Sequence, residues 1–99
     1  MDKRELVGII AEEDMITGFE FTGLVRNVEK PNFIPVTPET PEEELEILFS
    51  EMVTREDIAI IFICDFAAEK IHNTIKKYND VLPSILIIPS KQIKANKDI

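Results

Sequence analysis

Cysteine and histidine are almost absent from this sequence of 99 residues. Cys64 is the single cysteine, which excludes an internal disulfide and a cysteine-based zinc site. It ends an apolar run, so we expect a small buried side chain rather than a nucleophile. His72 is the single histidine, and we expect it at the surface because no second ligand lies near it in sequence. Thr17 and Ser90 lack an identifiable histidine base, so nucleophilic catalysis has no support.

Glycine is also scarce, with only Gly8, Gly18 and Gly23. No glycine-rich phosphate-binding motif follows the first apolar segment, and the three acids there, residues 12–14, would repel a phosphate. Gly8 lies inside a predicted strand, whereas Gly18 and Gly23 are spaced for helix packing. The sequence therefore gives no indication of a nucleotide pocket, and we expect no cofactor.

No apolar run approaches the ~18 residues that a membrane-spanning helix needs, and no signal peptide is present. We therefore expect a cytoplasmic protein without direct membrane insertion. The net charge of −8 is uneven, because residues 1–65 carry a balance of −11 and residues 66–99 a balance of +3. An acidic body argues against binding to nucleic acid or to an anionic membrane. The basic end contains Lys91, Lys94 and Lys97, which either meet an acidic partner or form a solvated terminus.

Four apolar segments alternate with three amphipathic segments along the chain. The predicted strands are residues 6–11, 33–36, 58–64 and 85–88. The predicted helix caps are Asp14, Thr40 and Asp65, with Pro41 and Glu43 completing a capping box after Thr40. Three consecutive glutamates, residues 42–44, favour the positive end of that second helix and so indicate a helix start rather than a cation site.

This alternation predicts one α/β domain with a four-stranded parallel sheet flanked by three helices. Pro35 cannot donate to a neighbouring strand, so the second strand belongs at an edge. The strand order is then 2-1-3-4, a flavodoxin-like or Rossmann-like arrangement that is incomplete because its last strand is missing. We expect residues 1–91 to form this domain. Residues 92–99 form a C-terminal tail, which is either frayed or the start of a missing helix.

The predicted topology leaves one face of the sheet short of cover. Right-handed crossovers put the first helix on one face and the other two on the opposite face. The third and fourth strands are nevertheless apolar on both sides. Each exposed isoleucine or leucine forgoes ~1.5–3 kcal/mol of burial. We therefore hypothesise that another chain covers this face or pairs with the fourth strand; the alternative is that the first helix and the tail cover enough.

Acidic residues at strand ends raise one enzymatic alternative. The acids of residues 12–14 and Asp65 could converge at the carboxyl edge of the sheet, with Ser90 and Lys91 after the fourth strand. Such a set is typical of a phosphoryl-accepting receiver domain, in which carboxylates hold a divalent cation. Receivers, however, need an additional strand and helix, and Asp65 is equally well placed as a helix cap. Nothing in the chain amounts to a catalytic site.

Five segments in order resemble the F subunits of V-type ATPases. The first, Ile10–Phe19, has an acidic turn followed by Thr-Gly-Phe, as in the opening motif of that family. The others are similar to its later strands and helices. They are Pro31–Phe33, Arg55–Ile63, Ala68–Ile71 and Val81–Lys91. The resemblance covers residues 6–91, is closer to eukaryotic than to bacterial members, and lacks the C-terminal helix that eukaryotic members usually have.

The resemblance implies a non-catalytic component of the central rotor stalk of a V-type proton ATPase. It implies that the chain binds the coiled-coil D subunit and other stalk subunits, and helps to couple ATP hydrolysis to proton transport. The location implied is the cytosolic face of vacuolar or endosomal membranes. Candidate partner-binding residues are Ile85, Ile87, Ile88, Pro89, Ser90 and Lys91. Residues of the family motif with an expected structural role are Asp14, Thr17, Gly18 and Phe19.

Overall fold

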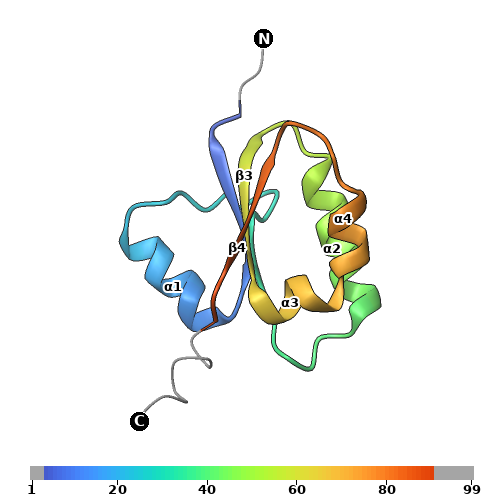
Figure 1. The fold of residues 1–99 in the computed structure, drawn as a ribbon. Helices are drawn as coiled ribbons and strands as arrows, with labels where there is room; N and C mark the ends of the chain where they lie inside the picture. The colour runs from blue at the N-terminus through green and yellow to red at the C-terminus, as the bar shows by residue number, and fades with distance from the viewer. Residues whose placement is uncertain (1–3, 91–99) are drawn as a thin grey trace.

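A four-stranded parallel sheet separates the helices of this protein into two layers (Figure 1). The structure is a computed structural model and describes residues 4–90. The sheet order is β2-β1-β3-β4 and every neighbouring pair is parallel, which confirms the predicted fold. The strands are β1 (Leu6–Ala11), β2 (Phe33–Pro35), β3 (Ile58–Cys64) and β4 (Ser84–Ile88). The helices are α1 (Glu13–Phe21), α2 (Glu42–Val53), α3 (Asp65–Lys70) and α4 (His72–Lys77).

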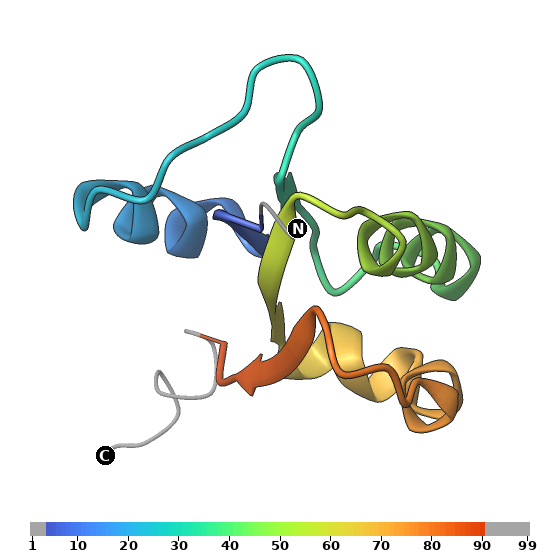
Figure 2. The same cartoon turned by 90° about the horizontal axis from the view of Figure 1, so that it is seen from above.

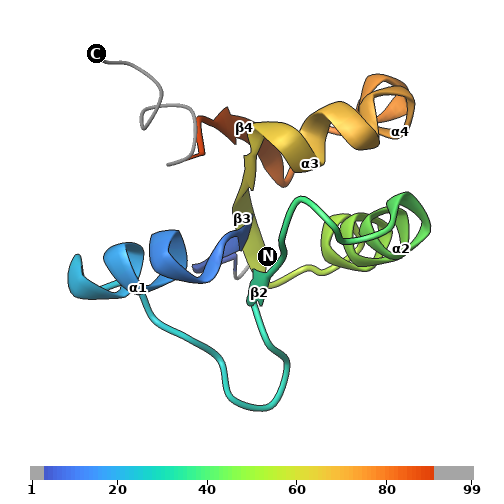
Figure 3. The ribbon, with the colours of Figure 1, turned by 90° about the horizontal axis from the view of Figure 1, so that it is seen from below.

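The helices divide unequally between the two faces of the sheet (Figures 2 and 3). Helix α1 lies on one face, and α2, α3 and α4 lie on the other, as right-handed crossovers require. Helix α2 comes close to β1 at Gly8, where an added Cβ atom would lie 2.9 Å from the sulfur of Met52. The absence of a side chain at Gly8 thus leaves the space that Met52 fills.

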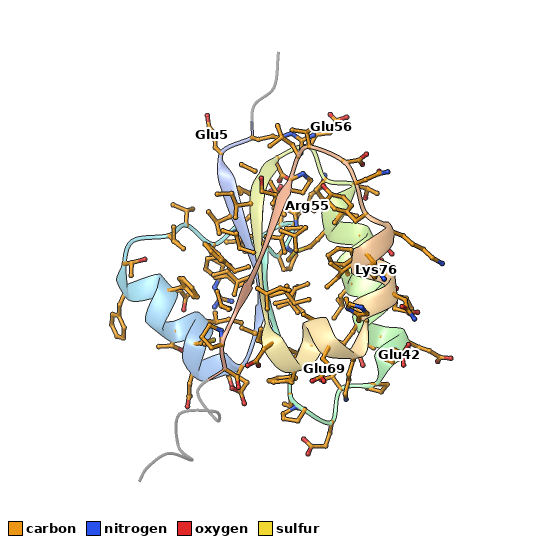
Figure 4. The ribbon with its side chains drawn as sticks, viewed as in Figure 1. Glu5, Glu42, Arg55, Glu56, Glu69 and Lys76 are labelled. Atoms are coloured by element: carbon orange, nitrogen blue, oxygen red, sulfur yellow. The ribbon has the colours of Figure 1, made fainter. Side chains whose placement is uncertain are left out.

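The hydrophobic core fills the space between the sheet and its helices. Helix α2 contributes Leu45, Phe49 and Met52, each 3% exposed or less, and the partly buried Leu48 packs against them. The opposite side of α2 is charged, and its first turn consists of three glutamates that suit the positive end of the helix dipole. Figure 4 shows Glu42 pointing away from the sheet, on the outer side of α2, and Lys76 on α4 is also exposed.

The three predicted helix caps are wrong by one or two residues. The observed N-caps are Glu12, Pro41 and Cys64, rather than Asp14, Thr40 and Asp65. Each observed cap has extended backbone with ψ between 150° and 157°. Because α1 and α3 follow their strands almost without a loop, the last extended residue takes the cap position. The Thr40 hydroxyl instead accepts a hydrogen bond from the Thr37 amide, at 2.9 Å.

The third predicted helix is two consecutive helices, because the backbone at Ile71 departs from helical values (φ −112°, ψ 34°). Ile71 is 1% exposed, and the break turns its side chain into the core. Helix α1 ends at Phe21, two residues before Gly23, so the predicted helix-packing role of Gly23 is wrong. Gly23 follows the C-cap with φ +97°, a conformation that favours glycine and stops the helix.

Candidate protein-binding surface

Strand β4 forms an edge of the sheet and carries large apolar side chains that water reaches. Leu86 is 47% exposed and Ile87 is 58% exposed. Ile88 is partly exposed and Pro89 is exposed, while no charged residue occurs in the strand. Each of these side chains would gain burial free energy if another surface covered it. Among residues 4–90, β4 pairs only with β3, so its outer edge remains open.

The two exposed apolar side chains of β4, Leu86 and Ile87, point to opposite faces. Gly8 faces α2 and pairs with Ile61, which in turn pairs with Ile85. Because side chains alternate along a strand, Ile87 points to the face that carries α2 and α3. Leu86 pairs with Phe62 and therefore shares the face of α1.

Helix α1 reaches β3 but leaves β4 uncovered. Phe19 of α1 stacks on Phe62 of β3, with ring centroids 5.3 Å apart and an interplanar angle of 18°. Figures 2 and 3 show no described helix beyond α1 on this side, next to β4. The thinly covered face predicted from the topology is therefore present at β4 within the described part of the chain.

The predicted partner-binding residues differ in their exposure. Ile87 and Pro89 are exposed, whereas Ile85 and Ile88 are half-buried and Ile85 packs against the core. Ser90 is only 2% exposed. Lys91 lies outside the described residues. Leu86 was missing from the prediction, because a strand that is apolar on both sides does not indicate which side remains open.

The residues of the family motif lie on and beside α1. Phe19 has the packing role described above. Asp14 lies in the first turn of α1 and not at the N-cap. Thr17 and Gly18 are exposed, and no atom of residues 4–90 comes within 4 Å of the position that a Gly18 Cβ would occupy. The predicted helix-packing role of Gly18 is therefore wrong, and nothing in the fold explains Thr17 and Gly18.

The acids at the carboxyl edge of the sheet do not form a receiver-like site in the described structure. An open hollow of about 460 Å³ lies beside Glu12, Glu13, Asp14 and Glu39. Asp65 does not line it; its carboxylate accepts a hydrogen bond from the Phe66 amide at 2.7 Å. Within residues 4–90, no three His, Cys, Asp or Glu side chains gather as a metal ion would require.

A second group of exposed apolar side chains lies near the opposite edge, at the end of α1 and on the segment that joins α1 to β2. It consists of Phe21, Val25 and Val28, which are 87%, 67% and 87% exposed. The buried Asn32 holds this segment in place: its amide group donates to the carbonyl oxygens of Val7 and Val25, at 2.8 and 3.0 Å. Val25 and Val28 therefore stand on an anchored loop, which sequence reasoning missed.

Arg55, labelled in Figure 4, precedes β3 and holds the end of the same loop in place. Its guanidinium donates to the carbonyl oxygens of Lys30 and Pro31, at 3.0 and 2.7 Å. It also forms an ion pair of 2.9 Å with Asp57. The hydrogen bond from Arg55 lowers the pKa of the Asp57 carboxyl.

Cys64, at the end of β3, is fully buried. Burial raises the pKa of its thiol to about 11, because the thiolate would lose its water. A thiol with this pKa is overwhelmingly protonated at neutral pH, so the structure agrees with the expected packing role and gives no reactive nucleophile. No helix within residues 4–90 has both the length and the apolar character to cross a membrane.

The comparisons with known proteins agree with this architecture. The profile of the family called ATP synthase (F/14-kDa) subunit matches residues 7–99. The F subunit of the V-type proton ATPase of Dictyostelium discoideum is 39% identical over 93 residues, which cover 92% of this chain and 78% of that protein. The F subunit of the V-type proton ATPase of Xenopus laevis is 40% identical, and the match covers 85% of this chain and 78% of that protein. The F subunit of Homo sapiens is 33% identical, and the match covers 89% of this chain and 76% of that protein.

A solved structure has the same fold. It is the F subunit of the V-type ATP synthase from Archaeoglobus fulgidus, with a TM-score of 0.60 at 16% identity over 86% of this chain and 98% of that one. The fold and the open β4 edge define a small α/β domain with a surface suited to binding another protein. The chain belongs to the family of the ATP synthase (F/14-kDa) subunit, and its relatives there are F subunits of V-type proton ATPases.

Proposed function

We propose that this protein is a non-catalytic component of the central stalk of a V-type proton ATPase and that it binds the coiled-coil D subunit. The proposal rests on its family and on one observation: the uncovered apolar side chains of β4, above all Leu86 and Ile87. A stalk protein must hold its partner through repeated rotation. An uncharged apolar contact serves this purpose because salt screening hardly affects it.

The contact surface that we propose consists of β4 and the residues that follow it. Ile87, Ile88 and Pro89 contact the D subunit directly, together with Leu86. Ile85 is half-buried and Ser90 is buried, so in this proposal they hold the contacting residues in position. Lys91, which follows in sequence, is included because its positive charge suits an acidic part of the partner. In this role the protein turns with the D subunit and helps to pass the torque of ATP hydrolysis to the proton-moving ring, on the cytosolic face of a vacuolar or endosomal membrane.

The test compares two isoleucines of equal exposure. Ile87 on β4 and Ile47 on α2 are each 58% exposed, so Ile87→Lys and Ile47→Lys change charge and exposed area alike. Covering the exposed part of an isoleucine contributes about 1–2 kcal/mol, and burying a lysine adds a further cost. We expect Ile87→Lys to weaken binding to the recombinant D subunit by at least about tenfold in calorimetry.

Ile47→Lys is expected to bind the D subunit as the unchanged protein does, because α2 lies on the far side of the sheet from α1 and away from β4 (Figure 2). Circular dichroism must show that both variants are folded. Wild-type binding by folded Ile87→Lys would contradict the proposed surface. Absence of any complex between the unchanged protein and the D subunit would contradict the proposed function itself.

A further inference from the structure

The two edges of the sheet differ in how they are protected against a further strand. Edge strand β2 has three residues and ends in Pro35, which has no amide hydrogen to donate. Edge strand β4 has five residues and contains no proline, charge or bulge. Natural proteins usually protect open edges with such features. The sheet is therefore closed to strand addition at β2 and open to it at β4.

The exposed side chains of β4 restrict what can cover them. A helix packed on the α1 face would bury Leu86 but leave Ile87 in water, and a helix on the α3 face would do the reverse. A strand in the plane of the sheet has side chains on both faces and covers both at once. Such a strand would also form hydrogen bonds with the N–H and C=O groups on the outer edge of β4. No strand within residues 4–90 pairs with that edge.

The charge of the molecule argues against a second copy as this strand. Each copy carries a net charge of −8, so two copies repel one another. Strand β4 itself is uncharged, and Ser84 is its single polar side chain. A suitable partner segment is therefore extended and apolar on both faces over about five residues, in a chain other than a second copy of this one.

We propose that β4 accepts an extended segment of the D subunit, outside its coiled coil, as a fifth strand of the sheet. This inference rests on the proposed stalk function and adds to it a specific geometry, main-chain pairing along Ser84–Ile88. Affinity then comes from the backbone groups and from side chains on both faces. Recognition of this kind is β-strand addition.

Amide hydrogen exchange of the whole chain, resolved by NMR, tests the pairing. In the free protein, the β4 amides that point outward exchange quickly, while those bonded to β3 are protected. In the complex with the recombinant D subunit, we expect the outward amides to slow by at least about a hundredfold. The β2 amides serve as the internal control and keep the rates of the free protein.

Two substitutions test the involvement of both faces. Leu86→Ser and Ile87→Ser are each expected to weaken binding by about tenfold, and Ile47→Ser is the matched control that leaves it unchanged. If a helix docked on one face instead, only one of the substitutions Leu86→Ser and Ile87→Ser would weaken binding.

Each result decides between the two proposals. A complex in which the outward β4 amides exchange as in the free protein overturns strand addition and leaves the stalk function standing. Slow outward amides in the protein alone, with a doubled mass in sedimentation, would identify a second copy as the strand and overturn the proposed occupant. Failure of any complex to form with the D subunit overturns the stalk function together with this choice of partner.

Discussion

Replacing Asn32 with alanine should destabilise this protein more than any other single polar substitution in the loop that joins α1 to β2. Asn32 is fully buried, and its side chain makes three hydrogen bonds to the main chain. Its amide group donates to the carbonyl oxygens of Val7 and Val25, and its carbonyl oxygen accepts from the amide of Asn27 at 2.8 Å. The substitution removes all three bonds at once.

The expected cost follows from these contacts. Each hydrogen bond contributes about 1 kcal/mol, and polar groups left buried without a partner add to this cost. The total is about 3–5 kcal/mol, against a stability of ~5–15 kcal/mol for a small domain. For a chain of this length, we expect the melting temperature to fall by roughly 15–25 °C.

The assay is urea unfolding followed by circular dichroism, with Asn27→Ala as the matched control. The Asn27 side chain accepts from the amides of Glu29 and Lys30 at the exposed tip of the same loop. Its removal should cost only about 1 kcal/mol. A loss below about 1 kcal/mol for Asn32→Ala, with an unchanged denaturant slope, would refute the reasoning that this side chain anchors the loop.

Two further predictions concern titratable groups. Cys64 should react with a neutral thiol reagent at pH 8 only as fast as the protein unfolds, because the thiol is fully buried and its pKa is raised to about 11; rapid labelling of the folded protein would contradict this. Asp57→Asn should lower stability at pH 7. Since Arg55 lowers the folded pKa of Asp57, its contribution is present above the unfolded pKa and is lost as the pH falls below about 4, so the two unfolding curves should converge there.

The order of elements and the sheet topology could be predicted because they follow from local patterns. The unbroken apolar run of β3 indicated a strand buried within a parallel sheet, and Pro35 placed β2 at an edge. Phe19 was singled out only as a residue of the family motif, and its stacking on Phe62 could not be foreseen. These signals lie within a few residues of one another, so no knowledge of distant contacts was needed.

The helix ends were harder to predict because several residues compete for each cap. Thr40 had the sequence of a capping box, yet its hydroxyl bonds to Thr37 in the preceding turn. Asp65 had a capping side chain, but Cys64 is the last extended residue before α3 and takes that position. For α1 and α3, the residue that takes the cap position depends on where the preceding strand ends, and the sheet register determines that.

The sequence by itself determined the parallel α/β fold, the family and the expectation that one face lacks cover. Only the tertiary structure decided that Leu86 and Ile87 are the side chains left in water, on opposite faces of β4. It also decided that Asn32 is an anchor rather than a surface residue. The physical reason is that burial depends on how far α1 and α3 reach across the sheet, and residues distant in the chain set that reach.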